Sequence, residues 1–422
     1  MRKFAKTFNK NMIKRDFYLQ KIKNKMHNGM IKVITGIRRC GKSFILFDIF
    51  PEYLKETGVD DSHIIKIDLE DRRNKSLRNP DALLSYIDGK MQDDKMYYIL
   101  LDEVQHVPEF EDVLNSYLKI KNADVYVTGS NSRFLSKDVI TEFRGRGDEI
   151  RIKPLSYSEF VSAYNGSKEE ALKEYILYGG LPIVALTKEP IEKEKYLKDL
   201  FETTYLSDIK ERYHIKNDTE MGELISIVAS SIGGLTNPTK LVNTFKSVKN
   251  IDISKNTIIS YLEMLQDVFM IEKSDRYDIK GKKYINTPAK YYFEDMGLRN
   301  ARLNFRQIEE THLMENLIYN ELRRRGWSVD VGEVVVNEVV DGKKMRKQLE
   351  VDFVCNLGYK RLYIQSAYSI ADDNKREQEL RPLRNINDSF RKIIIVWDNI
   401  ARYQNNDGVL YVNIFDFLTE EL

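Results

Sequence analysis

Residues 36–43 read GIRRCGKS, which matches the phosphate-loop pattern G-x-x-x-x-G-K-[ST] at every fixed position. The loop follows the apolar run MIKVIT, which begins at Met30, and it precedes a segment of helix length. A phosphate loop joins a strand to a helix, so the surroundings of this stretch agree with the motif. We therefore predict an α/β fold with a parallel sheet around it.

Each fixed residue of this loop has a chemical role. Gly36 and Gly41 let the backbone curl, so that main-chain N–H groups and the start of the next helix face the phosphates. Lys42 is placed to reach the β- and γ-phosphate oxygens, and Ser43 to give its hydroxyl to Mg²⁺. ATP and Mg²⁺ are thus the predicted cofactors. The other predicted nucleotide-binding positions are Ile37, Arg38, Arg39, Cys40 and Phe44.

Short apolar runs alternate with helical patterns from residue 30 to residue 153. After the first run come IIKIDL near Ile64, YYILLD ending at Asp102, DVYVTG from Asp124 and EIRIKPL from Glu149. Strands separated by helix-length segments indicate βαβ units and a parallel sheet. The N-terminal part of the chain is therefore predicted to be a P-loop domain.

Two acidic residues end the third of these runs. Asp102 is predicted to hold Mg²⁺, and Glu103 to orient and deprotonate the attacking water. An acidic pair at a strand end is common by itself. It becomes specific here because it follows a phosphate loop with one strand–helix unit between them.

Two further groups of polar residues are candidates for the same site. The next strand ends in VTGSNS, residues 127–132, and Asn131 is predicted to sense or position the water. Thr128 and Ser130 lie in the same stretch, which is also typical of an ordinary turn before a helix. Arg144 and Arg146 follow in FRGRGDE, where either could act as an arginine finger across a subunit boundary and Arg146 is the one predicted to do so. Solvated arginines are the alternative interpretation.

The middle of the chain changes character. Residues 157–232 carry apolar side chains at helical spacing, which predicts a helical region. The stretch 236–295 then reads as two helices, an apolar strand, a turn rich in Lys and Gly, and a second strand, an order typical of a winged helix-turn-helix. Its second helix could enter a DNA groove, and Lys280, Lys282 and Lys283 could touch phosphates. Winged helices also contact proteins, so an unknown protein partner remains an alternative.

The motifs together resemble a known family. GIRRCGKS, YYILLDEVQHV, YVTGSNSRFLS, FRGRGDEIRIKPLSYSEF, YGGLP and KYYFEDMGLRN are similar to the AAA+ ATPases of bacteria and archaea that carry a C-terminal domain of unknown function. The resemblance covers nearly the whole chain. It implies a P-loop AAA+ core at residues 1–156, a helical region at 157–232, a winged helix at 233–300, and a PD-(D/E)xK-like, restriction-endonuclease-like α/β domain at 301–422.

The C-terminal domain is predicted to be a degenerate nuclease fold. Nucleases of this class bind metal through a strand-end acid and a second acid that is followed two positions later by Lys. Glu315, Glu350 and Asp352 are the acidic candidates here. The next strand reads YIQSAYS, so Gln365 and Ala367 take the places of the second acid and the lysine. A fold used for binding is therefore expected, with a working ATP-gated nuclease as the less favoured alternative.

Composition sets the remaining expectations. The 422 residues suggest two to four domains, and 67 Lys and Arg against 65 Asp and Glu exclude a polybasic chain. Cys40 and Cys355 are far apart, which argues against a disulfide framework and a zinc site. No signal-peptide pattern or apolar run of bilayer length is found, so a cytoplasmic protein without a membrane anchor is expected.

Two functional interpretations follow from this pattern. The first is an ATPase that couples nucleotide state to its distal domains, with DNA as a candidate partner and a homo-oligomer as the assembly in which Arg146 would act. The second is a slow-turnover switch, a regulator or defence sensor that binds a protein partner. ATP turnover stimulated by DNA or by protein concentration would distinguish the first from the second.

Overall fold

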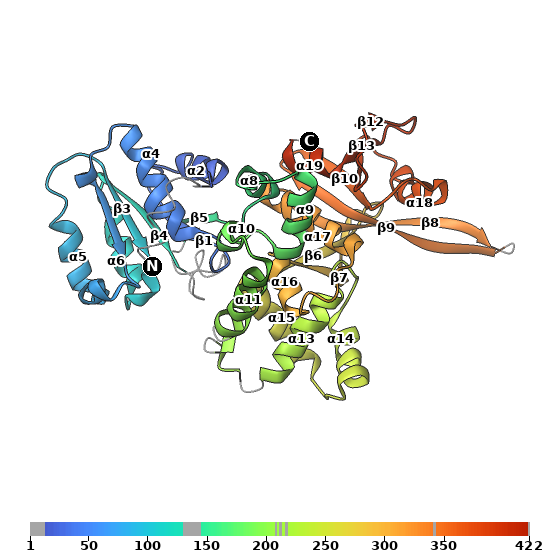
Figure 1. Ribbon diagram of the computed structural model, residues 1–422, viewed down its shortest axis with the longest axis horizontal. Coiled ribbons are helices and arrows are strands. Elements are labelled where there is room, and N and C mark those ends of the chain that lie inside the picture. The colour runs from blue at the N-terminus through green and yellow to red at the C-terminus, as the bar shows by residue number, and fades with distance from the viewer. Residues whose placement is uncertain are drawn as a thin grey trace. The chain divides into compact units, whose positions relative to one another are not determined.

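The computed structural model describes residues 13–129, 145–206, 209–210, 213–215, 218–340 and 343–420 (Figure 1). The chain divides into two compact units. Unit 1 contains Met1–Leu155 with the short segments Leu181–Ile183 and Asp267–Phe269, and unit 2 contains Ser156–Gly180, Val184–Gln266 and Met270–Leu422. The four segments expected from the sequence are thus arranged as two units.

Unit 1 is built on a five-stranded sheet in the order β2-β3-β4-β1-β5. Every pairing in it is parallel, which confirms the predicted α/β P-loop architecture. All residues of β1 and β3 are buried, as parallel strands covered on both faces must be. The strands are β1 (Ile31–Thr35), β2 (Ile64–Asp68), β3 (Tyr97–Asp102), β4 (Ala123–Thr128) and β5 (Gly147–Arg151).

The helices of unit 1 begin at sites that the sequence specifies locally. Asn79 accepts a hydrogen bond from the Ala82 N–H and stands before Pro80, a good first residue of a helix, so α5 starts there. The long helix after the phosphate loop runs through α3 (Lys42–Phe44), η2 (Ile45–Ile49) and α4 (Phe50–Glu56). The others are α2 (Asp16–Lys23), η3 (Asp61–His63), η4 (Arg72–Arg78), α5 (Pro80–Asp88), η5 (Val104–His106) and α6 (Phe110–Tyr117).

Unit 2 begins with the expected helical region. Ser156 and Ser167 each form a capping box with the glutamate three residues later, which satisfies the first N–H groups of α8 and α9. The helices before the first strand are α8 (Tyr157–Ser162), α9 (Lys168–Tyr178), α10 (Pro182–Leu186, which starts within a short segment of unit 1), α11 (Pro190–Leu200), η7 (Phe201–Leu206), α13 (Asp218–Ser230), α14 (Pro238–Thr244), η8 (Phe245–Lys249) and α15 (Lys255–Asp267).

The sheet of unit 2 has eight strands in the order β12-β13-β11-β10-β9-β8-β6-β7. The hairpin β6–β7 is antiparallel, and β6 pairs in parallel with β8, so the hairpin shares one sheet with the strands that follow it. The expected boundary between residues 300 and 301 therefore lies within one compact unit. The strands are β6 (Ile271–Asp278), β7 (Lys283–Phe293), β8 (Ser328–Val340), β9 (Lys343–Leu357), β10 (Lys360–Ala367), β11 (Arg391–Val396), β12 (Tyr403–Gln404) and β13 (Leu410–Asn413).

Helices α16 (Met296–Arg302), α17 (Glu310–Arg324), α18 (Asp373–Arg384) and α19 (Ile414–Thr419) complete unit 2. Residues of α17, β8, β9, β10 and β11 belong to one buried apolar cluster, and this packing holds α17 against the sheet. Glu315, which has only 8% of its surface exposed, lies on this helix. No helix in the described parts of the chain is long and apolar enough to cross a bilayer.

Candidate functional site

The phosphate loop leaves β1 in a conformation that only glycine tolerates at its first position. Gly36 has φ 138°, and a Cβ there would lie 2.0 Å from the Ile152 carbonyl oxygen. Gly41 has φ 100° and forms the N-cap of α3. Both glycines are therefore required by backbone geometry, as the motif predicts.

The Lys42 side chain is held against the phosphate loop by main-chain carbonyl oxygens of that loop. Its side chain is 5% exposed, and Nζ donates hydrogen bonds to the carbonyl oxygens of Gly36 at 3.0 Å and Ile37 at 3.3 Å. Within the described residues the structure records no ion pair for this ammonium group. A buried cation whose partners are neutral carbonyls keeps its charge available for an anionic ligand.

Arg15 braces the loop from a distant part of the sequence. Its Nη1 donates to the Cys40 carbonyl oxygen at 3.1 Å, and its Nη2 donates to the Lys153 carbonyl oxygen at 2.7 Å. The Cys40 thiol also donates to the Ile152 carbonyl oxygen at 3.4 Å. Arg15 is 2% exposed. No sequence pattern points to this residue, because its partners are main-chain carbonyls 25 and 138 positions away.

Asp102 lies at the carboxyl end of β3 and is buried. It accepts a hydrogen bond from the Thr128 hydroxyl at the end of the neighbouring strand β4. Burial raises the pKa of the Asp102 carboxyl, while hydrogen bonds from Thr128 and Ser43 act in the opposite direction. The predicted metal-binding residues Ser43 and Asp102 are therefore neighbours at this edge of the sheet.

Glu103 is positioned by an unusual backbone conformation. It adopts φ 54° and ψ 48°, in the left-handed region, where non-glycine residues are uncommon and occur preferentially at functional sites. Its N–H donates to Thr128 Oγ1 at 3.1 Å, and the Gln105 amide donates to its carboxylate. Thr128 thus contacts both acidic residues. The sequence named Thr128 only as a neighbour of the predicted sensor, and it gave no role to Gln105.

The donor set at this edge of the sheet fits Mg²⁺ and a nucleotide. One buried carboxylate and one hydroxyl are hard oxygen ligands, and Mg²⁺ takes few protein ligands beside water and phosphate oxygens. Ile37 is buried, while Arg39 is exposed with φ 65° and Ser43 is exposed at the start of the helix. The loop backbone is therefore curled as the motif requires. Arg38 and Phe44 are half-buried.

Of the other two predicted catalytic residues, the structure describes only Arg146. Asn131 lies outside the described residues. Arg146 is exposed and directly precedes β5, and its carbonyl oxygen accepts the Ile31 N–H at 3.0 Å, at the amino-terminal end of β1. The phosphate loop leaves the opposite end of β1, about 15 Å away at 3.3 Å per residue. Arg146 is thus outside the phosphate site of its own chain.

A second polar cluster is buried in unit 2, and it contains a lysine that the sequence analysis did not consider. Lys290 on β7 is 2% exposed. Its Nζ lies 2.8 Å from Glu315 Oε1 and 2.7 Å from Glu350 Oε1. The Tyr292 hydroxyl also donates to Glu315 Oε1 at 2.6 Å. Burial alone would lower the pKa of Lys290, but Glu315, Asp352 and Glu350 outweigh it and raise that pKa.

Gln365 and Asp352 lie on neighbouring strands of this cluster. The Asp352 N–H donates to Gln365 Oε1 at 2.7 Å, and Gln365 Nε2 donates to Glu379 Oε2 at 2.9 Å. Burial and the nearby Glu315 raise the pKa of Asp352, and Lys290 opposes that shift. Burial also raises the pKa of Glu379. Ala367 is buried in an apolar cluster, so this position supplies no charge.

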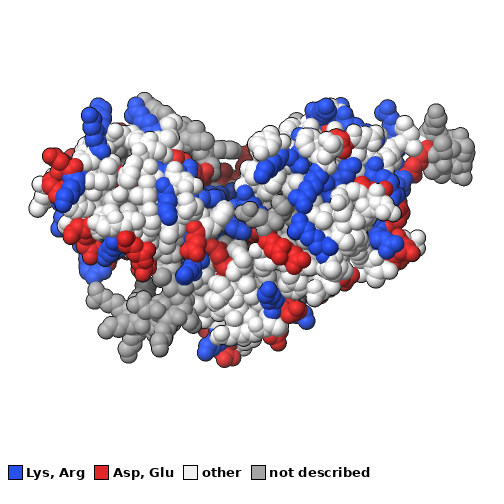
Figure 2. Space-filling view, turned by 90° about the horizontal axis from the view of Figure 1, so that it is seen from above, with Lys and Arg blue, Asp and Glu red and all other residues white. Residues whose placement is uncertain are grey.

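Neither cluster offers an all-protein metal cage. In the described ranges, no group of three or more His, Cys, Asp and Glu side chains is arranged to hold a metal ion. Cys40 and Cys355 are both buried free thiols. On the face shown in Figure 2, Lys and Arg side chains occur beside Asp and Glu, in keeping with a formal net charge of +2.

Known proteins resemble this chain in sequence and in fold. Residues 28–161 match the family model of an AAA domain, and residues 169–309 match that of a domain of unknown function. An uncharacterised protein of Haemophilus influenzae is 33% identical over 97% of this chain and its own full length. One of Methanocaldococcus jannaschii is 32% identical over 88% of this chain and 80% of its own. A Walker-type ATPase of Pyrococcus abyssi superposes with a TM-score of 0.50 at 16% identity, over 70% of this chain and 97% of that one.

Proposed function

The chain belongs to the family of AAA-domain proteins that includes the Haemophilus influenzae relative, and from that premise we propose that it binds and hydrolyses ATP at its phosphate loop. One observation carries the proposal. The Thr128 hydroxyl at the end of β4 donates a hydrogen bond to the buried carboxylate of Asp102 at the end of β3, and Ser43 of the phosphate loop lies beside that carboxylate. A metal ligand, a phosphate loop and an acidic strand end are thus brought to one edge of the sheet.

Each residue of the site has a separate role in the proposed hydrolysis. Main-chain N–H groups of the loop and the Lys42 ammonium bind the phosphates, so Lys42 exchanges two carbonyl oxygens for phosphate oxygens. Ser43 and Asp102 hold Mg²⁺, which offsets the charge of the phosphates when it is bound. Glu103 accepts the proton of the attacking water. Thr128 is a positioning residue, because it fixes Asp102 and the Glu103 backbone together.

The Lys42→Ala variant tests the phosphate-site assignment. We expect calorimetry to show a loss of ATP affinity of at least about tenfold, or 1.4 kcal/mol, because the only ammonium group that the motif places against the β- and γ-phosphates is removed. Lys119→Ala, at an exposed position in unit 1, is the matched control and should bind ATP like the wild type. Unchanged ATP affinity in a folded Lys42→Ala protein would refute the assignment.

We also propose that the active form is a homo-oligomer in which Arg146 of one copy reaches the phosphates bound by another. Its place at the amino-terminal end of the sheet supports action from a neighbouring copy, since its own loop lies at the other end. Specific ATPase activity should therefore rise with protein concentration, and Arg146→Ala should remove that rise while ATP still binds. Constant activity per subunit over a dilution series, with a monomer throughout, would exclude this role.

The finer assignments in unit 2 are proposals too. We propose that α14, α15 and the hairpin β6–β7 act as a winged helix, supported by their order along the chain. The order of α17, three antiparallel strands, α18 and a parallel strand supports a nuclease-like fold used for binding. Whether ATP turnover drives a motor or a slow switch with a protein partner is decided by comparing turnover with and without DNA.

A further inference from the structure

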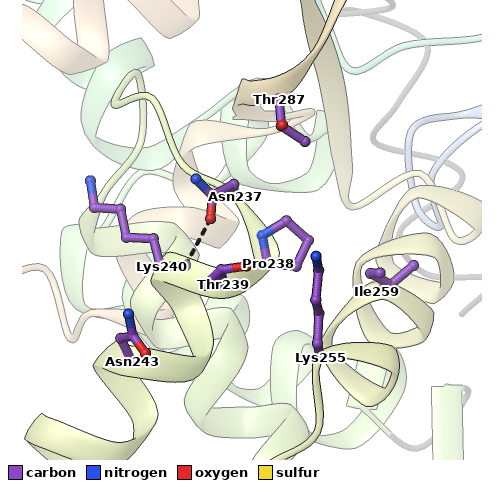
Figure 3. Close-up of a pocket in the computed structure, with 8 residues that line it drawn as sticks. All are labelled: Asn237, Pro238, Thr239, Lys240, Asn243, Lys255, Ile259 and Thr287. Carbon is purple, nitrogen blue, oxygen red and sulfur yellow. Dashed lines mark hydrogen bonds between the residues drawn. The ribbon is translucent and has the colours of Figure 1, made fainter.

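A pocket of about 530 Å³ lies where the first turns of α14 and α15 meet strand β7 (Figure 3). Lys240 comes from α14, Lys255 is the first residue of α15, and Thr287 comes from β7. Figure 3 shows the two lysine side chains on either side of Pro238 and Thr239. Three segments that are separate in sequence therefore form one concave surface.

The lining has the composition of an anion site. None of the eight described residues that form it is acidic, and two are lysines. Thr239, Asn243 and Thr287 add hydroxyl and amide groups that can donate hydrogen bonds. The Asn237 side chain is already used, since it accepts the Lys240 N–H at 2.8 Å. Two positive charges with neutral donors between them suit a phosphate group.

The same residues indicate which source of phosphate fits. Lys240 and Lys255 are exposed, so the pocket is open to a large ligand. None of the lining residues is aromatic, and single-stranded nucleic acid is usually bound by stacking its bases on aromatic side chains. Contacts from lysine and short polar side chains to backbone phosphates are typical of duplex binding that does not depend on sequence.

The pocket differs from the basic turn that the sequence had suggested. Lys280, in the turn between β6 and β7, donates its Nζ to the Val335 carbonyl oxygen at 3.0 Å. Lys240 also has a carbonyl partner, Leu235, at 3.1 Å, but its side chain borders an open pocket beside a second lysine. The concave site therefore offers two ammonium groups to one ligand.

We propose that this pocket binds backbone phosphates of duplex DNA through Lys240 and Lys255, with Thr239, Asn243 and Thr287 as neutral donors. The site positions a duplex without reading its sequence, because none of these side chains has to reach a base edge. The inference is independent of ATP hydrolysis, which belongs to residues of unit 1.

The test measures binding of a short fluorescent DNA duplex to the full chain by anisotropy, over about 50 to 200 mM salt. The double variant Lys240→Ala with Lys255→Ala should bind at least tenfold more weakly. Its plot of log affinity against log salt should be shallower by about two, since each lost phosphate contact removes about one unit of slope. The matched control is Lys188→Ala with Lys195→Ala, which removes the same charge from exposed positions elsewhere in unit 2.

A second variant, an ATPase assay and a melting experiment with inorganic phosphate complete the test. Thr239→Glu places a carboxylate in the pocket and should weaken duplex binding without removing a lysine. ATPase activity without DNA should be the same in all of these variants, which separates failure of this site from failure of the ATPase. Equal binding by the pocket and control double variants would overturn the proposal. So would a wild type that binds no duplex, even if inorganic phosphate raises its melting temperature through the two lysines.

Discussion

Two buried lysines, one in each unit, show how partners decide what a buried charge can do. Lys42 in unit 1 donates to the carbonyl oxygens of Gly36 and Ile37, which are neutral dipoles. Lys290 in unit 2 lies between the carboxylates of Glu315 and Glu350. The first charge is available to an incoming anion, whereas the second is already neutralised.

The difference extends to the carboxylates near each lysine. Asp102 accepts a hydrogen bond from the Thr128 hydroxyl and lies beside Ser43, with no cation paired to it in the described residues, so it can accept a metal ion. In unit 2 the ammonium of Lys290 lies where the side chains of Glu315 and Glu350 converge. Unit 1 therefore has the features of a ligand-binding site. Unit 2 has an internal ion-pair network in which Lys290 and its carboxylates satisfy one another.

The largest expected effect concerns catalysis in unit 1. Glu103→Gln should bind ATP as tightly as the wild type but hydrolyse it about 10² to 10⁴ times more slowly, because an amide cannot accept the proton of water. Steady-state turnover and calorimetry on the same protein give both values. A wild-type rate would show that another group is the base.

The next effect concerns stability in unit 2. Lys290→Ala should cost about 3–5 kcal/mol of unfolding free energy, because it leaves buried carboxylates without their counter-charge. In the absence of nucleotide, Lys42→Ala should cost only about 1–2 kcal/mol, since its partners are neutral. Urea denaturation measures both, and Lys273→Ala on the exposed side of β6 is the control. Equal losses of unfolding free energy in Lys290→Ala and Lys42→Ala would show that the partners of a buried lysine do not decide its contribution to stability.

A third, smaller effect concerns how the unfolding free energy of unit 2 depends on pH. Gln365→Glu replaces the amide that donates to Glu379 by a carboxyl group, and two carboxylates in contact raise one pKa. A folded-state pKa above the unfolded value gives stability that is full at low pH and is lost as pH rises through the folded pKa. The variant should therefore lose about 1–3 kcal/mol more than the wild type between about pH 5 and pH 8. Parallel pH profiles by urea denaturation would contradict the expected contact between the two carboxyl groups.

A fourth prediction concerns the threonine that links the two acids of unit 1. Thr128→Val has nearly the same shape but loses the hydrogen bonds to Asp102 and from the Glu103 N–H, at a cost of about 1–3 kcal/mol. The pKa of Asp102 should rise further, so affinity for Mg²⁺ and ATP should fall more steeply as pH decreases. Thr57→Val, at the exposed C-cap of α4, also removes a hydroxyl that donates a hydrogen bond and is the control. If both variants bind alike at every pH, Thr128 does not position Asp102.

The last prediction is that the protein has no nuclease activity. No Mg²⁺-dependent cleavage of single- or double-stranded DNA should exceed background, with or without ATP, because Lys290 is paired with the carboxylates and Gln365 carries no charge. Gel assays on purified protein measure this directly. Reproducible cutting that disappears in Asp352→Ala would show that the cluster opens to bind a metal.

The sequence alone determined the phosphate site, because its elements are local. A loop of eight residues between a strand and a helix fixes the positions of Gly36, Lys42 and Ser43 relative to one another. The alternation of strands and helices then predicted a parallel sheet, which brings strand ends such as Asp102 to the edge where the loop lies. These inferences needed only short-range geometry and the rules of βαβ connection.

Only the tertiary structure decided the features that depend on distant residues. Arg15 reaches the main chain at Lys153, and Lys290 meets a helix and a strand that follow it by 25 and 60 positions. The pocket between Lys240 and Lys255 is formed by helices and a strand whose packing no local pattern encodes. Buried charges must find partners wherever the fold places them, and a sequence pattern does not record such partners. Lys290 therefore looked like an ordinary strand residue until the hairpin was seen to join the sheet.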